Sequence, residues 1–238
     1  MHFKLAIFKA FYTFAGSRAI QYSLSRYLKA FNLYFIMKKF ILGIGFSLLA
    51  GAASAQTMGV KAGLNLGTLR GEHAENYDYR PGYTAGITAR HGFNELIGIQ
   101  TEVLYTSKGS KYTFNTSDVE TEDRLRLNYL DIPVLLHLQV SGLFFELGPQ
   151  ASFLLKAKRI REVSRANTTT TTETDITDDP YPIDFGYAAG LGYRAPSGIG
   201  LGLRYNGGLK NIDDEGAYEG RERRNSSFQL TLSYVPGF

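Results

Sequence analysis

Apolar and polar residues alternate with a period of two along most of the chain after Gln56. In the first stretch Val60, Ala62, Leu64 and Leu66 alternate with small or polar residues. Successive side chains of a β-strand point to opposite faces, so this pattern predicts strands. It recurs in seven further stretches, at 83–89, 97–105, 125–140, 143–155, 185–193, 199–205 and 228–234. No run of about eighteen apolar residues follows Gln56, which excludes helical membrane spans in that part of the chain.

The fourth of these stretches is the least regular, because its apolar residues change parity. Leu127 and Tyr129 share one parity, whereas Ile132 and Val134 share the other. An extra residue in a strand reverses the facing of all that follow, and proline cannot donate a ladder hydrogen bond. We therefore expect a bulge near residues 131–133.

The connections between the expected strands are alternately short and long. The short ones are at 91–95, 140–142 and 196–198, and the long ones are at 67–80, 109–123, 156–182 and 210–224. In an up-and-down meander, this order places every short turn at one end and every long loop at the other. Such an asymmetry is typical of outer-membrane barrels.

The distribution of aromatic and charged residues separates a membrane barrel from a soluble barrel or sandwich. Two aromatic bands bracket an aliphatic band on one face, as expected where rings lie at the headgroup level. The loop-end band holds Tyr83, Tyr105, Tyr129, Tyr187 and Tyr205, and the turn-end band holds Tyr193, Tyr234 and Phe238. The opposite face mixes charged, small and bulky residues, which suits a narrow interior. We expect an all-β, eight-stranded antiparallel up-and-down transmembrane β-barrel, with apolar side chains facing outward.

A secretory signal precedes this region. Lys38 and Lys39 form a charged segment, an apolar run follows to Ala50, and small residues at 53–55 suit a signal peptidase. The apolar run is shorter than the roughly twenty residues that a spanning helix needs. We expect residues 1–36 to come from a mis-assigned upstream start and to lie outside the fold. Residues 37–55 are then a cleavable signal peptide, and residues 56–238 form the barrel domain in the bacterial outer membrane.

The net charge depends on that division. The whole chain has 26 Lys and Arg against 22 Asp and Glu, a formal charge of +4. Residues 1–55 contain seven of the basic residues and no acid, which leaves a net charge of about −3 after Gln56. The excess of basic residues, which would be the compositional evidence for a nucleic-acid partner, is therefore absent after Gln56. The absence of cysteine excludes disulfides and thiolate metal sites.

Three segments resemble a known family. They are LRLNYLDIPVLLHLQV from Leu125, FELGPQASFLL from Phe145 and FGYAAGLGYRAPSGIGLGLRYNGGLKNI from Phe185. These segments are similar to those of the PorT-like outer-membrane β-barrel domain proteins of Bacteroidota, and the resemblance extends over 56–238. It implies an eight-stranded barrel in the outer membrane, and little about activity. The family's namesake serves protein secretion across that membrane.

The inward-facing charges are the first candidate site. An eight-stranded barrel encloses just enough room for its own side chains, and an unpaired buried charge costs several kcal/mol. We expect the cations to pair with the acids of this face, Asp131 included, as a structural polar plug; a gated or proton-conducting path is the alternative. The expected network is Lys61, Arg90, Glu102, Glu146, Arg194 and Arg204.

A basic cluster follows the strand that ends at Leu155. It comprises Lys156, Lys158, Arg159, Arg161 and Arg165, just outside the loop-side interface. Several cations at this height are suited to lipopolysaccharide phosphates through charge-assisted hydrogen bonds. The alternative is a solvated strand edge that discourages pairing with other chains.

No catalytic arrangement is supported. His73 lies in a loop, and Ser107 or Ser110 could meet it only if the fold brought them together, which no spacing indicates. The acidic loop segments at 175–179 and 213–215 lack the glycine-spaced order of a calcium loop. We therefore expect no enzyme activity, no cofactor and no metal.

The leading functional interpretation is a non-enzymatic barrel with a structural or interaction role through four long surface loops. An accessory role in secretion and a small-solute channel are the alternatives. The expected partners are outer-membrane lipid and lipopolysaccharide, the barrel-assembly machinery through the terminal aromatic Phe238, and envelope or secretion proteins.

Overall fold

The computed structural model describes residues 56–71, 77–116, 119–165, 168–177, 180–212 and 223–236. The segment 1–36, the expected signal peptide at 37–55, His73 and Phe238 lie outside these residues. No helix in the described part of the chain is long and apolar enough to cross a membrane.

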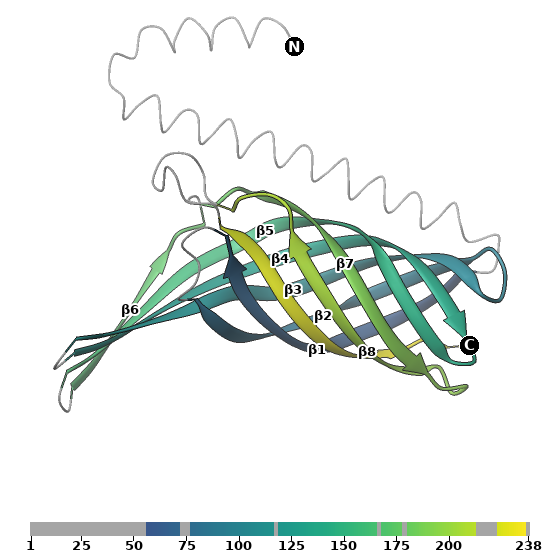
Figure 1. Ribbon diagram of the computed structural model, residues 1–238, viewed down its shortest axis with the longest axis horizontal. Helices are drawn as coiled ribbons and strands as arrows, with labels where there is room; N and C mark the ends of the chain where they lie inside the picture. The colour runs from purple at the N-terminus through teal and green to yellow at the C-terminus, as the bar shows by residue number, and fades with distance from the viewer. Residues whose placement is uncertain are drawn as a thin grey trace, which may run out of the picture. The chain divides into compact units, whose positions relative to one another are not determined.

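The described residues form antiparallel strands in a single sheet (Figure 1). In chain order they are β1 (Gln56–Arg70), β2 (Asp78–Gly92), β3 (Ile97–Thr116), β4 (Val119–Val140), β5 (Leu143–Arg165), β6 (Thr168–Asp175), β7 (Ile183–Arg194), β8 (Ile199–Gly208) and β9 (Arg224–Tyr234).

Eight of these strands close into a ring. Each strand pairs with its neighbour from β1 to β5, then β5 pairs with β7, and the ring continues through β8 and β9 back to β1. The ninth strand, β6, pairs with the outer part of β5 and lies outside the ring. The expected eight-stranded antiparallel barrel is confirmed.

The turns at one end of the ring are short, and their backbone conformation matches the twist of the strands that they join. Val140 pairs with Leu143, so β4 and β5 are joined by Ser141 and Gly142 alone. Both turn residues have positive φ, 50° and 86° respectively, as a type I′ hairpin turn requires. The short connections at 93–96 and 195–198 lie at the same end, since β2–β3 and β7–β8 are antiparallel pairs of the ring.

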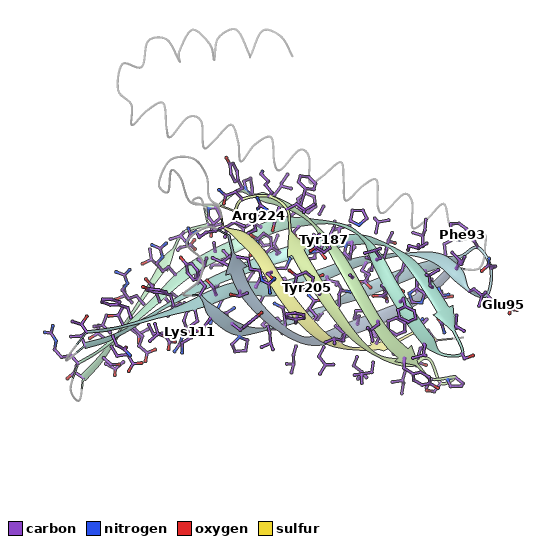
Figure 2. All side chains as sticks on the ribbon, in the orientation of Figure 1. Phe93, Glu95, Lys111, Tyr187, Tyr205 and Arg224 are labelled. Atoms are coloured by element: carbon purple, nitrogen blue, oxygen red, sulfur yellow. The ribbon has the colours of Figure 1, made fainter. Side chains whose placement is uncertain are left out.

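The apolar face of the ring points outward. Leu203 and Leu232 are 51% and 58% exposed, whereas Glu102 and Arg204 are 1% and 3% exposed. Figure 2 shows side chains projecting all around the barrel, with Phe93 and Glu95 at the turn end. This inversion relative to a soluble protein matches a barrel whose outer wall contacts hydrocarbon.

Aromatic rings form the expected belt near the loop end, with one exception. Tyr83 stacks on Tyr105 with ring centroids 5.9 Å apart, and Tyr205 lies 6.0 Å from Tyr187 and 5.1 Å from Phe228. Rings at this level suit the membrane–water interface.

The exception is Tyr129, which was expected in the belt but lies inside the barrel with no exposed surface. Its parity on β4 is that of the buried Asp131 and Leu135, so β4 keeps one facing throughout. The prediction of a bulge near 131–133 is therefore wrong. The sequence pattern predicts that the apolar residues Leu127 and Tyr129 face outward. In the structure they face an apolar part of the interior.

The irregularity lies instead in β5, opposite that point. Asn128 pairs with Lys156 and Tyr129 pairs with Leu154, so Leu155 is the extra residue. Leu155 and Lys156 are both exposed, and the neighbours Leu154 and Ala157 are both buried. An inserted residue reverses the facing of the strand beyond it, as in a β-bulge.

Two of the expected surface loops are strands. Pairing between β3 and β4 runs to Thr116 and Val119, and pairing between β5 and β6 runs to Arg165 and Thr168. The segment 109–123 and most of 156–182 therefore extend the sheet past the rest of the ring, as Figure 1 shows for β3 to β6. No residue is buried in the outer part of this extension, at 111–116, 119–124, 161–165 and 168–175, so the sequence there lacks the alternation that marks the wall.

Replacing one apolar residue of the outer wall by a charged residue tests whether this face contacts hydrocarbon. We expect Leu203→Arg, near the middle of β8, to lower the free energy of unfolding in lipid vesicles by about 2–4 kcal/mol, because the charge enters hydrocarbon. The matched change Thr171→Arg on the fully exposed β6 should alter it by less than about 0.5 kcal/mol. The shift of folded barrel in unheated gels measures the folded fraction across a guanidinium series. Equal effects of the two substitutions would contradict the assigned face.

Candidate functional site

A charge cluster occupies the middle of the barrel interior. Lys61 Nζ on β1 lies 2.5 Å from Glu102 Oε1 on β3 and 3.8 Å from Glu146 Oε2 on β5. Arg204 on β8 donates from Nη1 to Glu102 Oε2 at 2.6 Å and from Nη2 to Glu102 Oε1 at 2.9 Å. Its Nη2 also pairs with Glu146. Four strands thus contribute two cations and two carboxylates to one place.

This cluster is balanced in charge and buried. The four side chains are between 1% and 6% exposed. The amide of Gln100 donates to both acids, at 2.7 Å to Glu102 and 2.7 Å to Glu146. Buried charges are tolerated only when they are paired and hydrogen-bonded, and the ion pairs of this cluster offset the desolvation cost of its members. The same pairs connect strands on opposite sides of the ring.

The other two expected members lie toward the turn end and do not join this cluster. Arg90 Nη1 donates to Gln139 Oε1 at 2.6 Å. The Arg194 guanidinium lies over the Phe144 ring, 5.4 Å from its centroid. The structure therefore brings together four of the six expected residues and gives the remaining two other neighbours.

Phe144 is the centre of the turn-end layer. His137 stacks on it with ring centroids 5.4 Å apart, and His137 Nδ1 lies 3.4 Å from Glu146 Oε1. Glycines on the adjacent strand β7 and on β8 leave space for the ring, since a Cβ would be 2.3 Å from Phe144 Cζ on Gly192 and 3.2 Å from it on Gly202. This layer blocks the interior between the charge cluster and the turn end.

A second polar layer lies on the loop side of the charge cluster. Lys108 Nζ is 2.8 Å from Asp131 Oδ1 and 3.3 Å from Ser152 Oγ. Asn225 donates from Nδ2 to Asp184 Oδ2 at 2.8 Å. Lys108 has the parity of Gln100 and Glu102, so the period of two could have identified it as inward-facing. It was missed because β3 was expected to end near that residue.

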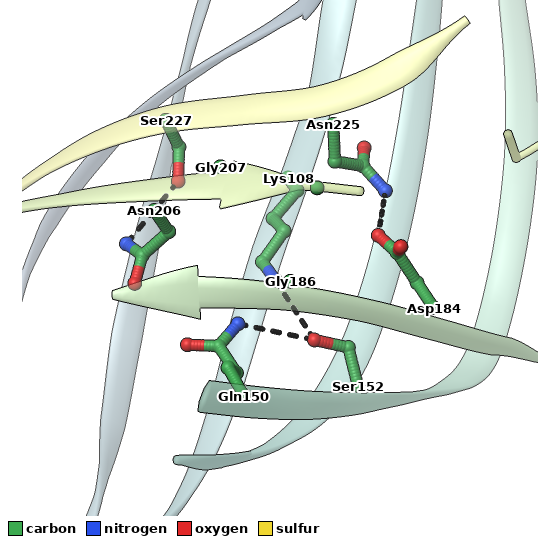
Figure 3. A pocket seen from close by; sticks show the side chains of 10 residues that line it. Lys108, Gln150, Ser152, Asp184, Gly186, Asn206, Gly207, Asn225 and Ser227 are labelled. Carbon is green, nitrogen blue, oxygen red and sulfur yellow. Dashed lines mark hydrogen bonds between the residues drawn. The ribbon is translucent and has the colours of Figure 1, made fainter. Parts of the chain in front are cut away.

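An apolar cluster closes the loop end of the interior. It comprises Leu69, Leu127, Tyr129, Leu154, Ala157 and Ile212, with Tyr77, Leu125 and Ile176 packed against it. The Tyr129 hydroxyl accepts a hydrogen bond from Asn225 Nδ2 at 3.3 Å. Side chains thus occupy every layer of the described interior, which leaves a cavity of only about 10 Å³ in the loop-side polar layer (Figure 3), as an eight-stranded ring allows.

The expected basic cluster lies on the extension, where most of its members face acids on adjacent strands. Lys158 pairs with Glu173 on β6, and Arg161 Nη2 lies 2.8 Å from Asp123 Oδ2 on β4. Lys156 Nζ is 3.8 Å from Asp175 Oδ2. Arg159 lies half-buried on the same strand. Contact of Lys156, Lys158, Arg159 and Arg161 with lipopolysaccharide phosphates stays a prediction.

The residues considered for catalysis are poorly placed for it. Ser107 and Ser110 are only 2% and 1% exposed. The Ser107 backbone carbonyl accepts a hydrogen bond from Asn65 at 2.9 Å. In the described ranges, no three His, Cys, Asp or Glu side chains are grouped closely enough to hold a metal ion.

The sequence of the described barrel also matches a known family. The family model described as outer membrane protein beta-barrel domain matches residues 54–214. The chain belongs to this family. It is therefore a barrel of the bacterial outer membrane, with the short turns at the periplasmic end and the extension at the cell surface.

Solved structures of other outer-membrane barrels are similar to it. The attachment invasion locus protein Ail of Yersinia pestis has 13% identity and a TM-score of 0.40, covering 76% of this chain and 99% of its own. Neisserial surface protein A has 13% identity and a TM-score of 0.43, with the same two coverages of 76% and 99%. OprG of Pseudomonas aeruginosa has 8% identity and a TM-score of 0.36, covering 76% of this chain and 96% of its own. These likenesses are weak, and the family assignment rests on the sequence match. No curated protein matches the sequence of this chain.

One isosteric substitution tests how much the central charge cluster contributes to the stability of the barrel. We expect Glu102→Gln to lower the free energy of unfolding by about 3–5 kcal/mol, because Lys61 and Arg204 remain buried with one carboxylate between them. The control Glu162→Gln removes a partly exposed ion pair with Arg124 and should cost less than about 1 kcal/mol. Guanidinium unfolding in vesicles provides the measurement. A stability of Glu102→Gln equal to that of the control would show that the central ion pairs do not hold the barrel together.

Proposed function

We propose that this outer-membrane barrel is a non-enzymatic interaction protein that binds partners at the cell surface through the extension formed by β3 to β6. The observation that carries the proposal is the combination of a filled interior with a sheet that continues beyond the membrane. Transmembrane strands need about 9–11 residues, whereas β4 has 22 and β5 has 23. The excess length serves no purpose in spanning the membrane, and it displays a surface to the medium.

The extension has an open edge suited to a partner strand. β6 pairs with β5 and with no other strand among the described residues, and every residue of β6 is exposed. Its sequence from Thr168 to Thr172 is five consecutive threonines, a residue that favours extended backbone. An exposed strand edge offers unpaired N–H and C=O groups, and addition of a strand from a partner is a common mode of recognition.

The filled interior argues against the small-solute channel. Side chains of Phe144, the Glu102 cluster and the apolar cluster around Leu127 succeed one another along the barrel. Moving a solute through would require these buried contacts to open together. A passive path therefore has no support in the described interior.

A secretion accessory is the second candidate. It is supported by the resemblance of the segments at 125–140, 145–155 and 185–212 to PorT-like proteins. The extension suits such a role also, since an accessory subunit contacts other envelope proteins. The identity of the proteins bound by the extension separates this candidate from a general surface interaction.

Shortening the outer hairpin tests the interaction. Ile160 pairs with Glu173 across β5 and β6, so replacing 161–172 by Asn-Gly gives a two-residue turn that keeps β5 up to Ile160. The change also removes the partners of 119–123 on β4, which belong to the extension. We expect proteins that co-purify with the barrel after gentle detergent extraction to fall by about tenfold or more, in keeping with a loss of at least 1.4 kcal/mol of binding free energy. Quantitative mass spectrometry measures the yields, and Thr170→Ser, which keeps the edge, is the control. An unchanged set of co-purified proteins, or recovery of the native barrel alone, would contradict the proposal.

Planar bilayers test the channel alternative. Purified barrel should give no steady single-channel currents, because side chains occupy every layer of the interior in the described part of the chain. A porin inserted from the same detergent serves as the positive control. Regular unitary currents that change amplitude in Glu102→Gln would establish conduction through this interior instead.

A further inference from the structure

Two arginines lie close to each other on the outer face of the wall at the loop end. Arg126 on β4 has the parity of the exposed Val134 and so faces outward. Arg80 on β2 donates from Nη1 to the Ser107 hydroxyl at 3.4 Å and to the Lys108 carbonyl at 3.2 Å. Ser107 has the opposite parity to the inward-facing Lys108 side chain, so Arg80 reaches the same outer face. The two arginines are within electrostatic range of each other.

The aromatic belt adjoins both arginines. Arg80 is within electrostatic range of Tyr83, and Arg126 is within that of Tyr105. These two tyrosines stack on each other with ring centroids 5.9 Å apart. Aromatic rings of outer-membrane barrels mark the membrane–water interface, so the two guanidinium groups lie at the level of the lipid headgroups.

Three like charges meet at this point of the outer face. Arg126 lies directly opposite Lys158 in the register of β4 and β5, and Arg80 acts on Arg126 from the side of β2. On β3 the partner of Arg126 is Gly109, which brings no side chain and therefore no acid. Like charges that face each other in a sheet destabilise it, so this arrangement favours an anion among them.

The acids on this face are engaged by other cations. Glu173 is within electrostatic range of Arg126, but Lys158 pairs with Glu173 and acts on it more strongly. The remaining ion pairs of this face are Lys111–Glu122, Arg124–Glu122, Arg124–Glu162 and Lys156–Asp175.

Arg80 and Arg126 therefore differ from the other cations of this face. Both hydrogen bonds of Arg80 go to neutral acceptors. In the described part of the chain Arg126 Nε is buried and has no hydrogen-bond partner. Buried N–H groups are normally satisfied, and a guanidinium presents its donors in a fork that matches the oxygens of a phosphate. A water molecule would satisfy Nε but would leave the positive charges uncompensated.

We propose that Arg80 and Arg126 bind a phosphate group of an outer-leaflet lipid such as lipopolysaccharide, whose acyl chains lie along the apolar wall beside Tyr83 and Tyr105. The phosphate accepts charge-assisted hydrogen bonds from both guanidinium groups and offsets the repulsion between them. A lipid is the source because the site lies on the outer wall at headgroup level. The phosphate contact is thereby assigned to two residues outside the basic cluster at 156–165.

Calorimetric titration of the full barrel in an uncharged detergent at neutral pH tests this site. We expect lipid A to bind at least about tenfold more tightly than lipid A from which the phosphates have been removed. Arg126→Gln should raise the Kd for lipid A about tenfold, and Arg126→Lys, which keeps the charge without the fork, only about threefold. The control Lys156→Gln removes one exposed cation from the same face and should raise it less than about twofold.

Equal affinities for the two forms of lipid A would overturn the proposal. Equal effects of Arg126→Gln and Lys156→Gln would also overturn it, because they would show a diffuse attraction to the basic face. Inorganic phosphate should bind at least about a hundredfold more weakly than lipid A, since it has no acyl chains to bury; equal binding would replace the lipid by a free anion. The gel shift of the unheated barrel verifies folding of each variant. If Arg126→Gln does not fold, Arg80→Gln is held to the same tenfold expectation, and an unchanged Kd for that variant would refute the site.

Discussion

Closure of eight strands around a narrow interior is the constraint on which the rest of the structure depends. Hydrocarbon offers no hydrogen-bond partner to the backbone, so the strands must satisfy one another in a ring without edges. Once the ring is closed, every second residue shares a space that is only wide enough for side chains. Glu102 on β3 and Glu146 on β5 therefore meet Lys61 and Arg204, and each of these buried charges is compensated by a partner of opposite sign.

The interior changes character along the barrel axis, and each layer has its own means of satisfying its polar groups. Aromatic packing around Phe144 occupies the turn end, balanced ion pairs occupy the middle, and an acceptor-rich layer around Asp184 follows. The apolar cluster around Leu127 closes the loop end.

Beyond the membrane the constraint no longer holds, and the chain uses that freedom. Water satisfies exposed backbone groups, so β6 can keep an open edge there that would be untenable in lipid. The bulge at Leu155 lies where β5 leaves the wall, and it turns Lys156 outward and Ala157 inward. The ion pairs of the extension, such as Arg161 with Asp123, stabilise little individually, and they suit a surface that must stay soluble until a partner strand pairs with it.

The sequence by itself determined the eight strands of the ring, the outward facing of its apolar side, and the inward facing of Lys61, Glu102, Glu146 and Arg204. A period of two reports facing wherever the two faces of a strand see different surroundings. In the outer part of the extension no residue is buried on either face, so only the fold revealed that 111–116 and 168–175 pair as strands. Tyr129 was misplaced because the interior beside it is apolar, and the pattern cannot distinguish an apolar interior from lipid. Which charged residues pair was also decided by the tertiary structure. Glu102 and Arg204 lie 102 residues apart in the chain, and they meet only because of the register and closure of the ring. Arg90 and Arg194 have the same inward facing but contact other side chains.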